Sequence, residues 1–138
     1  MTELTPATQM IHDQMPLCAH LGIEAVDLDP SAVQLALAWR ADLCTAAGLL
    51  HGGALMALAD SAGAVCAVGN LPAGAVGTST IESKTNFLGA VRDGVVTATS
   101  RPLHAGSTTV VVETELRDGD DRLVAKVTQT QAILRPRG

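Results

Sequence analysis

The feature that most restricts the fold of this chain is one long apolar segment, residues 52–68, that has no polar stripe. Only Asp60 and Ser61 interrupt a run of glycine, alanine, leucine, methionine, valine and cysteine. A helix that is apolar on every side is normally buried on every side. We therefore expect a central helix that the rest of the chain encloses.

Strand-like runs lie on both sides of this segment along the chain. A short helix is expected within residues 7–20, where Pro16 interrupts the helical spacing. The expected strands cover residues 23–28, 33–39, 76–87, 95–104, 107–117 and 123–134. The sequence therefore predicts an α+β fold in which an antiparallel sheet is wrapped around one long central helix.

The composition limits both the size and the partners of the protein. A chain of 138 residues predicts a single domain over residues 1–138, and aromatic side chains make up only 1% of it. Such a light core favours oligomerisation. The formal net charge of -5 argues against nucleic acid or an anionic membrane as a partner.

The three cysteines predict neither a disulfide framework nor a metal site, because their number is odd and no CxxC spacing occurs. Since the first residues also lack a basic and apolar leader pattern, we expect a cytoplasmic protein. Residues 52–69 are barely long enough to cross a membrane. An ionised Asp60 near their centre would cost about 2.5 to 3.5 kcal/mol, so we expect no transmembrane helix.

Two features of the apolar segment indicate chemistry. A carboxylate inside an apolar helix has to be paired, hydrogen-bonded or used, so Asp60 is either a functional group or a structural cap or ion-pair partner. At the helix start, Gly52 and Gly53 would let a ligand oxygen approach unsatisfied N–H groups, which suits a developing oxyanion. The two glycines could equally serve close backbone packing.

Helix geometry separates these two features within one chain. His51 and Asp60 are nine positions apart, so they lie ~13.5 Å apart along the axis and point about 180° away from each other. One helix cannot aim both at a single ligand. If both act on one substrate, a second copy of the chain must supply one of them, which predicts an obligate dimer.

The stretch GLLHGGALMALAD, residues 48–60, resembles the hotdog-fold acyl-CoA thioesterases of the phenylacetate-pathway and 4-hydroxybenzoyl-CoA type. His51 and Asp60 meet the family pattern of His-Gly-Gly with an acidic residue nine positions after the histidine. The segment 104–127, the closing Arg-Pro-Arg at 135–137 and Leu-Gly-Ile at 21–23 extend the resemblance over most of the chain.

The resemblance implies that Asp60 acts as general base toward water or as a nucleophile that forms a mixed anhydride. It also implies that a backbone N–H within His51-Gly52-Gly53 polarises the thioester carbonyl across a dimer interface, while His51 orients the loop or the substrate. Six residues before this histidine the family commonly has Asn or Gln, and this chain has Thr45, a shorter group with one hydroxyl.

The resemblance further implies contacts to coenzyme A and to the acyl group. We expect the acyl pocket to be lined by residues around Leu55, Ala59 and Gly63 and by strand residues near Thr78 to Ile81. From composition alone, the Ser/Thr positions of the second stretch are ordinary strand residues and the two arginines a solvated tail. The implied substrate-binding residues are Thr78, Ser79, Ser107, Thr108, Arg135 and Arg137.

We therefore expect a homodimer, assembled further into a homotetramer, that hydrolyses short-chain or aryl acyl-CoA thioesters. No cofactor is expected apart from the coenzyme A of the substrate. Two alternatives stay open: a non-catalytic acyl-CoA-binding module, and a hotdog enoyl-CoA hydratase. The hydratase usually needs a histidine within the central helix, whereas His51 precedes it.

Overall fold

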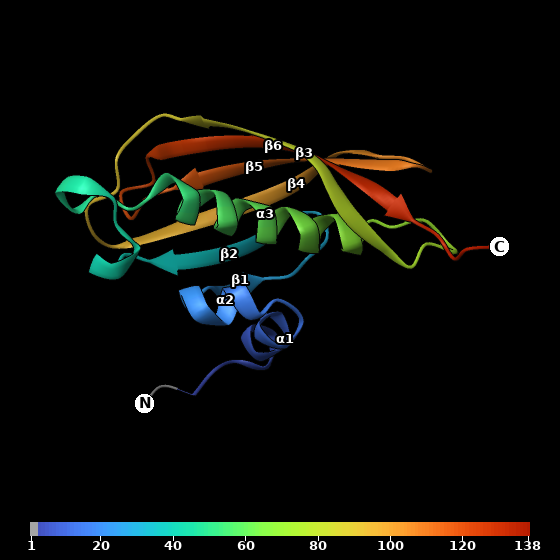
Figure 1. The fold of residues 1–138 in the computed structure, drawn as a ribbon, viewed down its shortest axis with the longest axis horizontal. Helices are drawn as coiled ribbons and strands as arrows, with labels where there is room; N and C mark the ends of the chain where they lie inside the picture. Colours follow the sequence, from blue (N-terminus) through green and yellow to red (C-terminus); the bar gives the residue numbers. More distant parts are fainter. Residues whose placement is uncertain (1–2) are drawn as a thin grey trace.

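A six-stranded antiparallel sheet curves around one long helix in the computed structural model, which describes residues 3–138 (Figure 1). The central helix is α3 (Gly52–Gly69). The strands are β1 (Glu24–Asp27), β2 (Val33–Ala38), β3 (Gly77–Phe87), β4 (Val95–Ala105), β5 (Thr109–Arg117) and β6 (Leu123–Leu134). Their order in the sheet is β1-β2-β4-β5-β6-β3. The expected α+β hotdog fold is confirmed.

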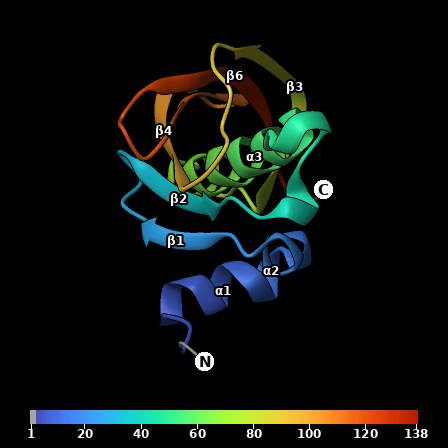
Figure 2. The ribbon, with the colours of Figure 1, turned by 90° about the vertical axis from the view of Figure 1, so that its left-hand side faces the viewer.

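Alternation along the strands explains why the sheet wraps α3. In β5, each second residue is buried, and Val110, Val112 and Leu116 are completely inaccessible to solvent. The β-branched side chains of this strand suit a pleated surface with one buried face. Figure 2 shows α3 inside the curve of the sheet, so the inward residues of β2, β4, β5 and β6 form the core with the underside of the helix.

The helix itself is covered on one side only, which corrects the expectation of burial all round. Leu55, Leu58 and Cys66 pack into the core, but Met56 is 42% exposed and Val68 is 54% exposed. The sheet covers the underside of α3 and the N-terminal helices lie along one flank, so a stripe of apolar surface stays open in the single chain. Hydrophobicity alone predicts that a face is covered, not which chain covers it.

By length and composition alone, α3 could cross a membrane, because it has 18 residues and a mean hydropathy of 1.4. In the structure this helix packs on the sheet, with 44% of the segment buried. A core helix of a globular domain satisfies the same length and composition test.

The N-terminal segment forms two short helices instead of the single one expected. They are α1 (Pro6–Gln14) and α2 (Pro16–Leu21). Met15 between them has φ −128° and ψ 87°, outside the helical region, because a following proline disfavours helical backbone. Two 3₁₀ turns, Ala41–Leu43 and Ala46–Gly48, lie in the loop that leads into α3.

Strand β3 is a long exposed edge of the sheet. It has 11 residues, pairs only with β6, and none of its residues is fully buried. On and beside it, Val76, Ile81, Phe87 and Leu88 are each more than half exposed. An edge strand of this length leaves unpaired N–H and C=O groups that can pair with another chain.

The Cys66 thiol predicts a specific loss of stability at alkaline pH. Burial raises the pKa of Cys66 from 9.0 to about 11. The unfolded thiol therefore ionises first, so this group does not change stability below pH 9 and lowers it as the pH rises from 9 to 11. Between pH 8 and pH 10.5, the free energy of unfolding measured with urea should fall by roughly 1 to 2 kcal/mol more for native protein than for Cys66→Ala. Equal losses would contradict the burial argument.

Candidate active site

Asp60 lies midway along α3, on the stripe that the sheet leaves open. Its carboxylate oxygen Oδ1 accepts hydrogen bonds from Thr80 Oγ1 and Gln129 Nε2, both at 3.1 Å. The side chain is exposed in the single chain, so the expected buried carboxylate is corrected. Within residues 3–138, no lysine or arginine forms an ion pair with Asp60. Two neutral donors therefore hold a carboxylate whose charge is not cancelled.

The hydrogen bonds to Asp60 come from two paired strands. Thr80 on β3 stands opposite Gln131 on β6, and the register shifts between Thr80 and Glu82. Gln131 Nε2 donates to Thr80 Oγ1 at 2.6 Å. Such β-bulges redirect side chains next to functional sites. Here the bulge follows directly after the residue that contacts the carboxylate.

At the start of α3, one backbone N–H group has no hydrogen-bond acceptor among the described residues. His51 is the N-cap, and its Nδ1 accepts from the Gly53 N–H at 2.7 Å. The N–H groups of Ala54 and Leu55 donate to the His51 carbonyl. In the part of the chain that the structure describes, nothing accepts a hydrogen bond from the Gly52 N–H. A ligand oxygen could take that hydrogen bond, and it could compete with His51 for Gly53.

Thr45 belongs to the same end of the molecule as His51. It lies in the loop before α3, where its N–H donates to the Leu49 carbonyl at 2.7 Å. The loop is held to α3 by the His51 N–H, which donates to the Leu43 carbonyl at 2.9 Å. Thr45 is exposed, so its hydroxyl is accessible at the helix start.

One chain does not bring this helix start and Asp60 together. Because α3 is continuous from Gly52 to Gly69, its rise keeps His51 ~13.5 Å along the axis from Asp60. Thr45 stays with His51, while Thr80 and Gln129 stay with Asp60. The structure therefore places the expected catalytic residues in two separate groups, one at the helix start and one around Asp60.

The residues expected to contact coenzyme A fall into three groups. Arg135 Nη2 donates to the Ser107 carbonyl at 2.9 Å, and the Thr108 carbonyl accepts from the Ile133 N–H, so these residues gather at the β4–β5 turn. Thr78 and Ser79 begin β3, opposite Ile133 and Ala132. Arg137 lies in the exposed C-terminal segment.

The expected acyl pocket is split in the single chain: its strand residues, Thr78 to Ile81, are half-buried or exposed, whereas its helix residues are buried. Leu55 and Ala59 belong to the core beneath α3, and Gly63 is buried against the Gln129 side chain. Space remains instead along the flank of α3 that faces α1 and α2. A groove of about 370 Å³ lies beside Leu17, Leu21 and Gly53, and one of about 420 Å³ lies beside Met10, Val65 and Val68. Both grooves are mainly apolar.

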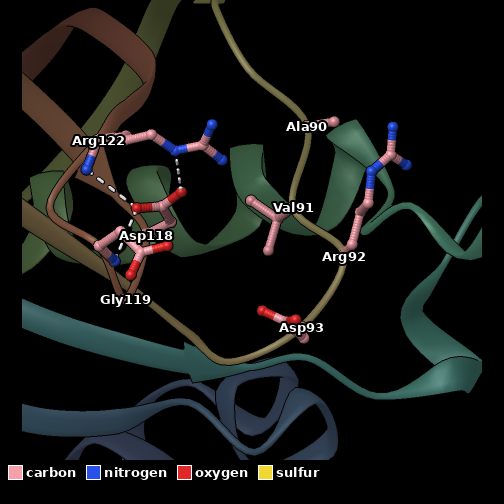
Figure 3. A pocket seen from close by; sticks show the side chains of 8 residues that line it. Ala90, Val91, Arg92, Asp93, Asp118, Gly119 and Arg122 are labelled. Atoms are coloured by element: carbon pink, nitrogen blue, oxygen red, sulfur yellow. Dashed lines mark hydrogen bonds and ion pairs between the residues drawn. The ribbon is translucent and has the colours of Figure 1, made fainter.

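A separate polar hollow of about 350 Å³ lies between the β3–β4 loop and the β5–β6 turn (Figure 3). Its two arginines are outnumbered by three aspartates, so it does not favour a phosphate. Asp118 also accepts from Arg122 Nε at 2.8 Å, and its hydrogen bonds, chiefly from the Arg122 backbone N–H, hold the pKa of Asp118 below its usual value. The charged lining residues are Arg92, Asp93, Asp118, Asp120 and Arg122.

Other reactive groups near Asp60 do not form an alternative centre. The Cys18 thiol donates to Ser61 Oγ at 3.3 Å. Burial raises the pKa of Cys18, and the negative charge of Asp60 acts in the same direction, which disfavours the nucleophilic thiolate. Over residues 3–138, no three His, Cys, Asp or Glu side chains come together as metal ligands.

Comparison with known proteins decides the family. The sequence pattern of the thioesterase superfamily matches residues 47–125, a span that includes His51, Asp60 and Thr80. The chain belongs to the thioesterase superfamily. This thioesterase is 38% identical over 91 residues to the 1,4-dihydroxy-2-naphthoyl-CoA hydrolase of Escherichia coli, a match that covers 63% of each chain.

Two further comparisons cover nearly the whole thioesterase. A 1,4-dihydroxy-2-naphthoyl-CoA hydrolase of Listeria monocytogenes is 28% identical over 123 residues, which is 89% of this chain and 99% of the relative. The crystal structure of a thioesterase from Haemophilus influenzae superposes with a TM-score of 0.86 at 24% identity, covering 98% of this chain and 92% of that one. The protein is a thioester hydrolase with the hotdog fold.

Sequence reasoning did not identify the hydrogen bonds that three residues form around Asp60: Thr80, Gln129 and Gln131. One signal was present. Residues 125, 127, 129, 131 and 133 share the inward face of β6, and that face changes from alanine and valine to two glutamines. Two amides on a core face require partners, which the structure identifies as Asp60 and Thr80.

Proposed function

We propose that this thioesterase hydrolyses short-chain or aryl acyl-CoA thioesters and that Asp60 performs the chemistry. The observation that carries the proposal is the asymmetry of the carboxylate: both hydrogen bonds reach Oδ1, and no residue of the described chain donates to Oδ2. A carboxylate that is held by one oxygen can use the other as base or nucleophile. The relatives named as naphthoyl-CoA hydrolases support a coenzyme A thioester as substrate.

Both roles of Asp60 lead to the same products. As a base, Oδ2 removes a proton from water while the water oxygen bonds to the thioester carbonyl carbon. As a nucleophile, Oδ2 itself bonds to that carbon, and water then cleaves the mixed anhydride. In either case the C–S bond breaks, the thiolate leaves as coenzyme A and takes a proton, and the acyl group leaves as the free acid.

The developing oxyanion is stabilised in our proposal by the helix start of the partner subunit. The free Gly52 N–H lies at the positive end of α3, and such donors are worth most where charge develops. The open stripe of α3 and the unpaired edge of β3 both carry exposed apolar side chains that a second copy would cover. The Thr45 hydroxyl would act beside Gly53, in place of the Asn or Gln side chain that the family commonly has at this position.

Coenzyme A binding is assigned in this proposal to the residues expected from the resemblance. Ser107, Thr108 and Arg135 form one cluster, and Arg137 follows in the exposed tail. Thr78 and Ser79 lie on the same strand as Thr80. We further propose that two dimers associate into a homotetramer, which would cover more of the exposed apolar surface.

Thiol release from a panel of short-chain, long-chain and aryl acyl-CoAs tests the proposal. Native protein should release coenzyme A from at least one short-chain or aryl member above the rate without protein. Binding of acyl-CoA without thiol release would identify a binding module. Hydration of an enoyl-CoA without thiol release would identify a hydratase, which the capping role of His51 disfavours. Either result would overturn the proposal.

A further inference from the structure

We propose that Gln129 and Gln131 are positioning residues that fix the orientation of the Asp60 carboxylate, and that Gly63 provides the space they need. This inference rests on the proposed function of Asp60. Gln129 is completely buried and Gln131 is 1% exposed. Burying an amide is unfavourable unless its polar atoms are satisfied, so two such side chains on one strand need an explanation beyond core packing.

Gln129 contacts the carboxylate directly. Its Nε2 donates to Asp60 Oδ1 at 3.1 Å, whereas its buried Oε1 has no partner among the described residues. A side chain that served only stability would favour satisfying both ends. The amide is instead held with its donor toward Asp60 and its oxygen toward Gly63.

Gly63 makes this arrangement possible. It lies on α3 three residues after Asp60, and a Cβ at this position would overlap the Oε1, Cδ and Nε2 atoms of Gln129. Any other residue would therefore displace the amide from the carboxylate. The glycine is explained by the close approach of this side chain, since its backbone lies within a regular helix.

Gln131 acts through Thr80. Its Nε2 donates to Thr80 Oγ1 at 2.6 Å, and Thr80 Oγ1 lies 3.1 Å from Asp60 Oδ1. A hydroxyl has a single hydrogen. Because the Thr80 oxygen accepts from Gln131, its own hydrogen is directed to Asp60.

The two routes converge on one oxygen of the carboxylate. Gln129 and Thr80 both donate to Oδ1, so the plane of the carboxylate is restrained while Oδ2 accepts nothing from the described chain. Neutral donors restrain the group without cancelling its charge, as an arginine would. The expected contribution is therefore to kcat and not to substrate affinity.

The test compares Gln129→Met with native protein, because methionine has a similar shape and no donor. We expect kcat for thiol release to fall about 10- to 100-fold, the effect of one hydrogen bond to a charged group, with KM changed less than about threefold. Thr114→Val is the matched control, since it removes a buried hydrogen bond between Thr114 and Ser100, 2.6 Å long, that does not involve Asp60. It should keep the native kcat.

A double-mutant cycle tests the route through Thr80. Gln131→Met should lower kcat in the native background and leave it unchanged in the Thr80→Val background. Thr80 is exposed, so Thr80→Val should fold even if a glutamine variant does not, and its own kcat should fall about tenfold. Gly63→Ala should destabilise the fold, and adding Gln129→Ala, whose shorter side chain removes the overlap, should restore stability. A double variant with a kcat no lower than that of Gln129→Ala alone would support the packing argument.

The outcomes separate this inference from the proposed function. If native protein releases no thiol from any acyl-CoA, the proposed function fails. If native protein is active and both Thr80→Val and Gln129→Met keep the native kcat, the positioning role is overturned. If Gln129→Met fails to fold, Thr80→Val alone tests the inference. A Thr80→Val variant with the same kcat as native protein would then overturn it.

Discussion

Replacing Asp60 by asparagine is expected to lower kcat for acyl-CoA hydrolysis about 10²- to 10⁴-fold, the usual contribution of a general base. Asparagine keeps the size of the side chain and an oxygen that can accept from Thr80 and Gln129. It lacks the second anionic oxygen that would take a proton or attack the carbonyl. The fold and the affinity for acyl-CoA should therefore be preserved while turnover is lost.

Steady-state thiol release and calorimetric binding of the same acyl-CoA measure the two effects separately. Asp93→Asn is a suitable control, because Asp93 is exposed and lines the separate polar hollow, and this variant should match native protein. An Asp60→Asn variant within about threefold of the native kcat would remove Asp60 from the chemistry. A loss of binding equal to the loss of turnover would indicate a binding role instead.

Two inactive chains are expected to restore activity when they assemble together. In Gly52→Pro the spare N–H is absent, and losing one oxyanion donor should lower kcat about 10²- to 10³-fold. Co-expressed with Asp60→Asn, this chain would form mixed dimers in which one site combines an intact Asp60 with an intact helix start. Random assembly makes about half of all dimers mixed, and each mixed dimer has one intact site out of two. About a quarter of native activity should therefore return.

Proline at this position should leave α3 intact. Gly52 is the first helical residue, where proline is well tolerated, and His51 has φ −62° and ψ 134°, which suits a residue before proline. Gly52→Ala is the matched control, because its Cβ also approaches Phe87 Cζ at 3.0 Å but its N–H remains. Mixed dimers that stay inactive would show that the helix start and Asp60 do not act together.

The sequence predicted the elements of the fold better than the contacts of the site. The helix over 52–69 and the strands of the sheet follow from patterns within single segments. The exposure of Asp60 was not predictable, because an apolar pattern does not distinguish a face covered by the same chain from one left for a partner. Its contacts with Thr80 and Gln129 were not predictable either, because they depend on the register between β3 and β6 and on a bulge within it.

The register also explains why the apolar alternation of β6 was only a partial guide. The alternation marks an inward face, but two glutamines on that face do not identify their partners. Only the pairing of Thr80 with Gln131 shows which hydroxyl they reach. Site residues supplied by α3 itself, such as His51 and Asp60, were accessible to sequence reasoning because one helix sets their spacing.

The overlap between a side chain at position 63 and the Gln129 amide has a consequence for how such a chain can change over generations. A mutation that enlarges residue 63 first would displace the amide, whereas one that shortens residue 129 first would open a void and remove a donor. Each single step is therefore costly, and only the paired change restores packing. Positions 63 and 129 should vary together among descendants of this chain, although they lie 66 positions apart in sequence.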